Sequence, residues 1–263
     1  MSDKKTILIT GAGTGIGKDA AKALIARGHT VHATTHHDGE VATLQAELGP
    51  AAKVFKLDIT VAEDRAKIAG LGIDVLVNNA AQGQSGSLAE IDIDRVRRLF
   101  EVNLFSGLEL TQIAIRDMIA QGGGTVIFVS SIAGRIPTPF AMPYSMTKFA
   151  ISAAAAGLRD EMKTLGKGIH VSVVEPGPFK TGFNQKLSDS GIAWMEKGSI
   201  FTKEQVENVK SGTARTLALA EAGSPASVVG KLVAASEAKK PRLRYVAPLH
   251  FAILVQIMRM FGV

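Results

Sequence analysis

The sequence predicts an α/β fold in which helices cover both faces of a doubly wound parallel sheet. Short runs rich in Val, Ile and Leu recur along the chain, and longer segments with helical spacing lie between them. Near-continuous apolar strands are typical of parallel sheets that are buried on both faces. No linker, internal repeat or low-complexity stretch interrupts this alternation, so residues 1–263 are expected to form a single domain.

Each expected strand and helix follows from its local pattern. Strands rich in β-branched and apolar residues are expected at 6–10, 30–34, 53–57, 74–79, 125–130 and 169–176. Helical spacing predicts helices at 17–28, 40–48, 60–69, 94–120 and 144–165. Thr60 and Glu63 fit a capping box that would begin the third helix. The apolar segment 249–263 is expected to pack on the domain or on a second subunit, with a membrane-surface anchor as the alternative.

The composition fits an ordinary globular protein and excludes several kinds of site. Apolar residues make up 46% of the chain and charged residues 21%. Because there is no cysteine, disulfides, thiolate metal sites and cysteine nucleophiles are excluded. The amino-terminal segment does not resemble a signal peptide, and no apolar run reaches the roughly 18 residues of a spanning helix, so a cytoplasmic protein is expected. The basic residues behind the net charge of +6 are scattered, which favours one phosphate-binding cleft over a nucleic-acid surface.

The glycine-rich sequence TGAGTGIG follows the first predicted strand and runs directly into a predicted helix. Gly11, Gly15 and Gly17 fit the pattern TGxxxGxG, whereas the strict GxGxxG spacing fails. Glycines let the chain turn sharply and leave room for a pyrophosphate, to which the following helix presents its free N–H groups. Together with Thr14 and Ile16 in the same loop, they predict the cofactor-binding turn of a Rossmann-type fold.

The end of the second predicted strand lacks the carboxylate that would bind the ribose hydroxyls of NAD. Thr35, His36 and His37 stand there, and the first acidic residue is Asp38. A hydroxyl and an imidazole can hydrogen-bond to a ribose 2′-phosphate, which a carboxylate would repel. Thr35 and His36 are therefore expected to favour NADP, with NAD as the alternative. No metal site is expected at the two histidines, because no third ligand converges on them in the sequence.

Tyr144 and Lys148 stand four residues apart at the start of an alanine-rich predicted helix, so they share one face. A phenol is a poor base at pH 7, because its ordinary pKa is about 10. An adjacent ammonium group would favour the phenolate and lower that pKa, as acid–base catalysis near neutral pH requires. The same spacing also occurs between residues with structural roles, so by itself it leaves both interpretations open.

Further motifs surround the tyrosine–lysine pair. They are TGAGTGIG at 10–17, Asp58 after the third strand, NNA at 78–80, Asn103 in EVNLFSG, Ser131 in SSIAG, YSMTK at 144–148 and PGPFKT at 176–181. In this order and spacing they resemble the short-chain dehydrogenase/reductase family, in its single-domain branch, from Thr6 to about Val246. Ala81 stands where the family often has glycine, a departure that should leave cofactor binding intact.

The resemblance implies catalytic roles for four residues. Ser131, which precedes Tyr144 by 13 residues, would polarise the substrate oxygen, and Tyr144 would exchange a proton with that oxygen. Lys148 would lower the pKa of the tyrosine and hold the nicotinamide ribose. Asn103 would hold a water molecule in a proton relay from the lysine to solvent. The hydride itself would come from the cofactor.

The resemblance also implies the remaining cofactor contacts. Asp58 would face the adenine, and Ile59 beside it is a further expected contact. Asn79 and Ala80 would run along the nicotinamide ribose. The carboxamide and the pyrophosphate would be bound by Pro176, Gly177, Phe179 and Thr181.

The substrate site is expected after the PG motif, where residues 184–204 would form a lid. An adaptable apolar wall is expected from Phe140, Met142, Phe183, Trp194, Met195 and Phe201, about half of which would serve the core or a subunit contact instead. The segment PRLRYVAP and the end of the second strand resemble the hydroxysteroid and retinol dehydrogenase subset. That resemblance implies a bulky hydrophobic ketone or secondary alcohol as substrate.

The predicted activity is hydride transfer between NADP(H) and a secondary alcohol or ketone. A 3-oxoacyl thioester reductase is the enzymatic alternative, and a non-catalytic dinucleotide-binding regulator is the alternative from another class. The expected partner is a small-molecule substrate, with no nucleic acid and no membrane span. The family resemblance implies a homodimer or homotetramer, whose interface would use the helices at 94–120 and 144–165.

Overall fold

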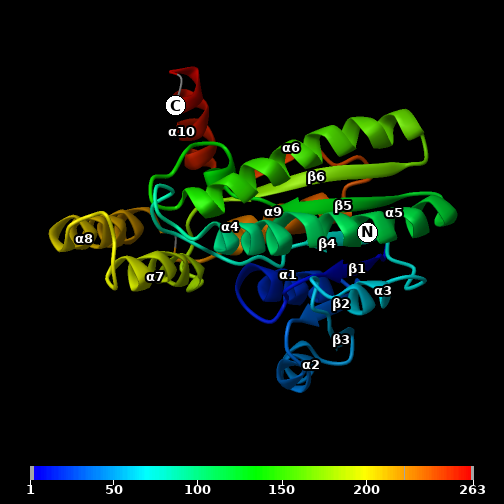
Figure 1. The fold of residues 1–263 in the computed structure, drawn as a ribbon. Coiled ribbons are helices and arrows are strands. Elements are labelled where there is room, and N and C mark those ends of the chain that lie inside the picture. The colour runs from blue at the N-terminus through cyan, green and yellow to red at the C-terminus, as the bar shows by residue number, and fades with distance from the viewer. Residues whose placement is uncertain (1–2, 222, 262–263) are drawn as a thin grey trace.

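A seven-stranded parallel sheet forms the centre of the protein in the computed structural model, which describes residues 3–221 and 223–261 (Figure 1). The strands are β1 (Thr6–Ile9), β2 (Thr30–Thr35), β3 (Ala52–Lys56), β4 (Val75–Asn78), β5 (Gly124–Val129), β6 (Ile169–Pro176) and β7 (Arg244–Ala247). Their order is β3-β2-β1-β4-β5-β6-β7, and every pair is parallel. Because the order reverses between β1 and β4, the sheet is doubly wound, as the sequence predicts, and a crevice opens there at the carboxyl edge.

Helices cover both faces of this sheet. They are α1 (Gly15–Ala26), α2 (Val41–Leu48), α3 (Ala62–Ala66), α4 (Ile93–Phe100), α5 (Ser106–Gln121), α6 (Met142–Leu165), α7 (Phe183–Met195), α8 (Lys203–Ala220), α9 (Ala226–Glu237) and α10 (Leu249–Met260). Side chains alternate along each strand. Ile7 and Ile9 of β1 accordingly pack in one core with α1, α2 and α9, whereas Leu8 packs in the other core with α5 and α6. The predicted fold class is confirmed.

Two local predictions in the first half of the chain are wrong. The helix expected at 94–120 is interrupted by a π-helical turn, Glu101–Phe105, which joins α4 to α5 and contains Asn103. The capping box is absent, since α3 begins after Val61 with no side-chain cap. Thr60 instead donates its backbone N–H and its hydroxyl to Asp58 Oδ1, at 2.9 and 2.7 Å. An aspartate two residues upstream forms such a turn locally, in competition with a helix cap.

The second half of the chain contains elements that the periodicity did not predict. β7 follows several cations and adds one short strand at the edge of the sheet, and α9 covers one face beside α1. α7 and α8 lie beyond the carboxyl edge of the sheet (Figure 1). Residues 262–263 of the predicted terminal segment lie outside the described residues, and α10 buries Val255 while it exposes Ile253 and Ile257. Across 3–221 and 223–261, none of the helices combines the length and the hydropathy needed to cross a bilayer.

Candidate active site

A cleft of about 960 Å³ lies along the carboxyl edge of the sheet. Nearly all of the residues that the sequence predicts for the site line it, from elements far apart in the chain. These are Gly11, Thr14, Gly15, Ile16, Gly17, Thr35, His36, Asp58, Ile59, Asn79, Ala80, Ser131, Tyr144, Lys148, Pro176, Gly177, Phe179 and Thr181. Asn103 lines a small neighbouring cavity instead. The fold thus assembles the candidate cofactor and catalytic residues in a single cleft.

The glycine loop after β1 is packed so closely that side chains would not fit. Gly11 has a φ of +62°, and a Cβ built on it would lie 2.9 Å from the Cα of Ala80. A Cβ on Gly17 would lie 2.5 Å from the side-chain nitrogen of Asn79. α1 begins at Gly15, so its first N–H groups face the cleft beside this loop. Such a cradle of backbone at a helix N-terminus fits the pyrophosphate of a dinucleotide.

Thr10 ties this loop to the end of β4. Its hydroxyl accepts hydrogen bonds from the backbone N–H groups of Asn79 (3.0 Å) and Ala80 (2.9 Å). The Asn79 amide in turn donates to the carbonyls of Thr10 and Gly11, at 2.9 and 3.0 Å. The side chain of Asn79 therefore braces the glycine loop, while Ala80 borders the cleft.

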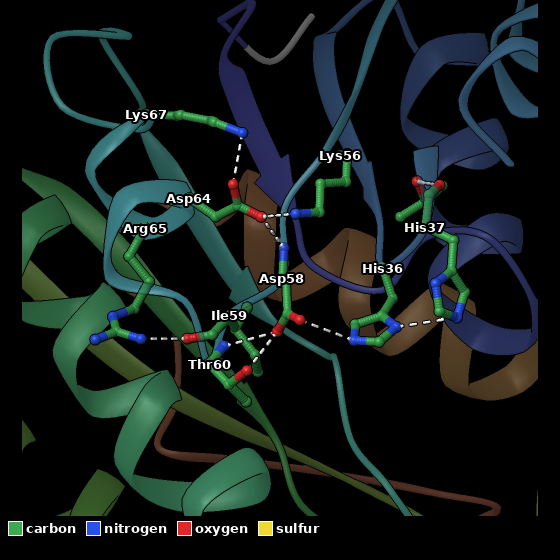
Figure 2. Close-up of polar contacts among 10 residues, drawn as sticks. His36, His37, Lys56, Asp58, Ile59, Thr60, Asp64, Arg65 and Lys67 are labelled. Atoms are coloured by element: carbon green, nitrogen blue, oxygen red, sulfur yellow. Dashed lines mark hydrogen bonds and ion pairs between the residues drawn. The ribbon is translucent and has the colours of Figure 1, made fainter. Parts of the chain in front are cut away.

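The end of the cleft beside β2 and β3 carries a hydrogen-bonded chain of Thr60, Asp58, His36 and His37, which Figure 2 shows in line. His36 Nε2 lies 3.0 Å from Asp58 Oδ2, and its Nδ1 lies 3.1 Å from His37 Nε2. Burial opposes ionisation of Asp58, but the hydrogen bonds from Thr60 and the contact with His36 hold its pKa below the ordinary value. Asp58 does border the cleft, although it also serves this local network.

Thr35, which the sequence assigns to a ribose 2′-phosphate, is only 1% exposed. Its hydroxyl donates to the carbonyl of His37 at 3.0 Å, so it is not available as a donor to a ligand. The His36 side chain is 55% exposed and already contacts Asp58. Among the described residues, no group of three or more potential ligands is arranged to hold a metal ion.

Two consecutive serines follow β5 and have different surroundings. Ser130 is 2% exposed and donates to the carbonyl of Lys148 at 2.9 Å, with Ser152 Oγ also at 2.9 Å. Ser131 begins the 3-10 turn Ile132–Gly134 by accepting the N–H of Ala133 at 3.1 Å. The Ser131 hydroxyl also donates to the carbonyl of Pro176 at 3.4 Å, and its proximity to the Tyr144 phenol opposes the rise of the tyrosine pKa. The geometry therefore supports Ser131, and not Ser130, as the serine that can reach a ligand together with Tyr144.

Tyr144 and Lys148 lie on one face of α6, but burial changes their pKa values in a way the sequence did not predict. Tyr144 is 8% exposed and packs against Phe183, and burial raises its pKa although the nearby Ser131 hydroxyl opposes the rise. The Lys148 Nζ lies 5.5 Å from the centre of the tyrosine ring and donates to the carbonyl of Val129 at 2.8 Å. Burial lowers the pKa of Lys148 to about 7. The predicted lowering of the tyrosine pKa is thus wrong for this structure, because burial disfavours the phenolate and Lys148 donates to a backbone carbonyl instead of to the phenol.

Asn103 sits on the π-helical turn between α4 and α5 and is 5% exposed. Its amide nitrogen donates to the carbonyl of Gln82 (2.9 Å) and to Thr147 Oγ1 (3.0 Å), while its oxygen accepts the N–H of Gln82 (2.8 Å). A cavity of about 10 Å³ is lined by both Asn103 and Lys148. That volume is close to the minimum for one water molecule.

The outer wall of the cleft is formed mainly by α7 and α8. Of the six predicted wall residues, Phe140, Phe183 and Met195 line the cleft. Trp194 and Phe201 pack in the cluster that joins α7 to α8, and Met142, the first residue of α6, does not line the cleft. α8 also forms part of this wall, which was not predicted from the sequence; its lining residues are Asn208, Val209, Gly212, Thr213, Thr216, Leu217 and Ala220. Their helical spacing was a usable signal, but their small and polar character does not mark them as a pocket wall.

Comparisons with known proteins agree with this architecture. Residues 5–191 match the family model for short chain dehydrogenases. The uncharacterized oxidoreductase YbbO of Escherichia coli is 30% identical over 258 residues, which cover 96% of this chain and 89% of that protein. The NADPH-dependent 3-dehydrocapnine reductase of Ornithobacterium rhinotracheale is 30% identical, covering 91% and 86%. A short-chain dehydrogenase structure from Streptomyces avermitilis superposes with a TM-score of 0.81 at 30% identity, covering 98% and 93%. This chain therefore belongs to the short-chain dehydrogenase/reductase family.

Proposed function

We propose that the protein interconverts a secondary alcohol and a ketone, with a nicotinamide dinucleotide as the hydride donor or acceptor. The observation that carries this proposal is that Ser131 and Tyr144 lie next to each other and line the same cleft as the glycine cradle. Lys148 stands one turn further along α6 and borders the same cleft. A hydrogen-bond donor pair beside a pyrophosphate cradle is what polarisation and protonation of a carbonyl oxygen require.

The bound cofactor would supply or accept the hydride. In the direction of reduction, Tyr144 donates its proton to the substrate oxygen as the carbonyl carbon gains the hydride, which gives the neutral alcohol. Burial raises the tyrosine pKa, so the hydroxyl holds its proton at neutral pH and is ready as a donor. Ser131 donates a hydrogen bond to the same oxygen and disperses its developing negative charge.

Lys148 would return a proton to Tyr144 through a water molecule that lies beside Asn103. The lysine can exchange a proton near neutral pH, because burial lowers its pKa to about 7. The cavity of about 10 Å³ between Lys148 and Asn103 could hold one water molecule of such a relay. The side-chain amide of Asn103 would keep the π-helical turn and Gln82 in place around that water.

The substrate would be hydrophobic. Phe183 packs directly on the Tyr144 ring, at 5.4 Å between ring centroids, and Met195 and Phe140 line the cleft beyond it. A wall with aromatic and methionine side chains suits an apolar ligand whose single polar group is held by Ser131 and Tyr144. α8 adds small residues such as Gly212, which leave room for a bulky substrate.

Subunit association would use the surface of α4 and α6, as the sequence suggests. Ile93 on α4 is 55% exposed, Phe105 on the π-helical turn 48%, and Phe149 on α6 37%. Apolar side chains gathered on adjacent elements support a homodimer or homotetramer. Sedimentation equilibrium of the wild type and of Phe149→Glu measures the assembly state directly. A monomeric wild type would rule this interface out.

The proposed reaction is tested by a panel of hydrophobic ketones, 3-oxoacyl thioesters and secondary alcohols with NADH and NADPH. The wild type is expected to oxidise one cofactor with a ketone, and Tyr144→Phe to lose at least about a thousandfold in kcat, because the proton donor is removed. Ser145→Ala is the matched control, since it removes a neighbouring hydroxyl that does not line the cleft. Tight dinucleotide binding without turnover of any compound would favour a regulator instead.

A further inference from the structure

Glu40 lies at the end of the cleft beside β2, where the adenosine of a bound dinucleotide would lie. No carboxylate was predicted at this end from the residues of β2. It ends a short 3-10 turn, Asp38–Glu40, that follows β2. This turn brings the Glu40 side chain over the glycine loop: a Cβ built on Gly13 would lie 3.3 Å from Glu40 Oε2. The Cβ built on Gly13 would also lie 3.6 Å from Cγ2 of Thr35, the last residue of β2. Glu40 therefore occupies the junction of the glycine loop and β2, and it lines the cleft.

The Glu40 carboxylate is available to a ligand. It forms no ion pair or hydrogen bond with any of residues 3–221 and 223–261, and its side chain is exposed. Asp58, the other carboxylate at this end, is already bound by Thr60 and His36. Because residue 13 is a glycine, no side chain separates Glu40 from the loop.

The lysine side chains of the cleft lie away from Glu40. Within the described part of the chain, the lysines that line the cleft are Lys148 on α6 and Lys186 on α7, and no arginine lines it. Both helices follow β5 or β6, whereas Glu40 follows β2 on the other side of the crevice. Lys56 is close to the adenosine end, but its Nζ pairs with Asp64 Oδ2 at 2.8 Å (Figure 2). The local charge at this end is therefore negative, apart from His36 and His37.

We infer that Glu40 selects the unphosphorylated adenosine ribose and so makes NAD(H) the preferred cofactor. A carboxylate accepts a strong, charge-assisted hydrogen bond from a ribose hydroxyl. A 2′-phosphate carries close to two negative charges at pH 7 and is repelled by the same carboxylate. This inference reverses the preference for NADP that Thr35 and His36 suggested. It rests on the proposed function, because it assumes that a dinucleotide occupies the cleft.

Binding of the adenosine half alone tests the inference without any catalysis. The ligands are ADP-ribose and its 2′-phosphate, measured by isothermal titration calorimetry on the full chain. The wild type is expected to bind ADP-ribose at least about tenfold more tightly than it binds the 2′-phosphate, since like charges placed together in a binding site are strongly unfavourable. Glu40→Gln is expected to reduce the ratio of the two dissociation constants by about tenfold, mainly because the phosphorylated ligand binds more tightly. Glu40→Lys should reverse the preference.

Asp38→Asn is the matched control. It removes the same charge two residues away, from an exposed side chain that does not line the cleft, and should leave the ratio within about twofold. Raising the salt concentration should weaken the discrimination in the wild type but not in Glu40→Gln.

Each remaining outcome has a distinct meaning. Tighter binding of the 2′-phosphate by the wild type, or an unchanged ratio in Glu40→Gln, would overturn the role of Glu40. Failure of both ligands to bind would overturn dinucleotide binding itself, and the inference with it. Tight and selective ADP-ribose binding without carbonyl turnover would uphold Glu40 and reject only the proposed reaction.

Discussion

Burial acts in opposite directions on the two titratable residues of α6 that face the cleft. It disfavours the charged form of each group, so it raises the pKa of Tyr144 and lowers the pKa of Lys148 to about 7. Around pH 7, Tyr144 is therefore neutral and Lys148 is close to half protonated in this structure. A tyrosine that keeps its proton suits reduction of a carbonyl, and a lysine that titrates near neutrality suits proton exchange.

The buried lysine predicts a specific dependence of stability on pH. Between about pH 7 and its ordinary pKa of 10.5, the unfolded chain binds a proton at Lys148 that the folded chain does not. The contribution of Lys148 to stability therefore rises with pH across this window, by at most about 1.4 kcal/mol per pH unit. Urea unfolding at pH 6, 8 and 9.5 measures this dependence. The free energy of unfolding of the wild type should increase relative to that of Lys148→Met as the pH rises.

Lys163→Met, at an exposed position on the same helix, is the control for this measurement. The difference in free energy of unfolding between Lys163→Met and the wild type should not change with pH. A flat difference for Lys148→Met as well would mean that the lysine is solvated in the folded protein.

At the scale of elements, one buried carboxylate connects the loop that contains Ser131 to the edge of the sheet. Glu175 on β6 is 0% exposed and pairs with Arg135 Nη1 at 3.0 Å and with Arg244 Nη1 on β7. Arg135 directly follows the 3-10 turn that Ser131 begins, and Ser152 on α6 contacts Glu175 Oε1 at 3.4 Å. Through these contacts, Glu175 connects the turn after Ser131 and α6 to β6 and β7.

Removal of the Glu175 charge should destabilise the fold strongly. Glu175→Gln leaves two arginine side chains without their shared anion, one of them 14% exposed, so the free energy of unfolding should fall by about 3 kcal/mol. Glu161→Gln on the exposed face of α6 should change it by less than about 0.5 kcal/mol. Urea unfolding measures both. A loss below about 1 kcal/mol for Glu175→Gln would mean that solvent already screens these pairs.

At the scale of the whole molecule, the cleft is closed by segments that are distant in sequence. Gly191 on α7 packs on the loop after β4: a Cβ there would lie 2.3 Å from Ser85 Oγ. Trp194, the single tryptophan, donates to the carbonyl of Ser85 at 3.4 Å from the same helix. Phe140 shares this cluster and accepts the N–H of Gly86 at 2.6 Å. α7 thus packs against the loop after β4 so closely that a side chain larger than glycine would not fit at position 191.

Gly191→Ala should push α7 away from that loop. Because the substrate is then held less accurately, kcat/KM for the preferred ketone should fall at least about tenfold, whereas ADP-ribose binding at the other end of the cleft should stay within twofold. The emission of Trp194 should change in the same variant. Gly198→Ala is the control, since nothing lies within 4 Å of a Cβ at that position. Equal losses in substrate and ADP-ribose binding would contradict this division of the cleft.

Local motifs explain why much of the fold and site was predictable. The glycine loop, Ser131 and Tyr144 each stand immediately beside a strand or at the start of a helix, so strand prediction places them at one edge of the sheet. The six predicted strands all exist, because each is a short apolar run buried on both faces. β7 was missed because an edge strand flanked by cations lacks that pattern. The interruption at Glu101–Phe105 was missed because the apolar spacing continues through a π-helical turn.

The sequence by itself determined the parallel sheet, the family and the candidate residues of the cleft, since these depend on short-range pattern. Only the tertiary structure decided the surroundings of those residues. It directs Lys148 to a backbone carbonyl, engages the Thr35 hydroxyl within its own turn, and brings Glu40 over Gly13. Desolvation, charge and hydrogen-bond competition depend on which atoms are neighbours in space, and 27 positions separate Glu40 from Gly13 in the chain. The sequence pattern therefore identifies the candidate site residues, whereas their contacts in three dimensions set the pKa values of Tyr144 and Lys148.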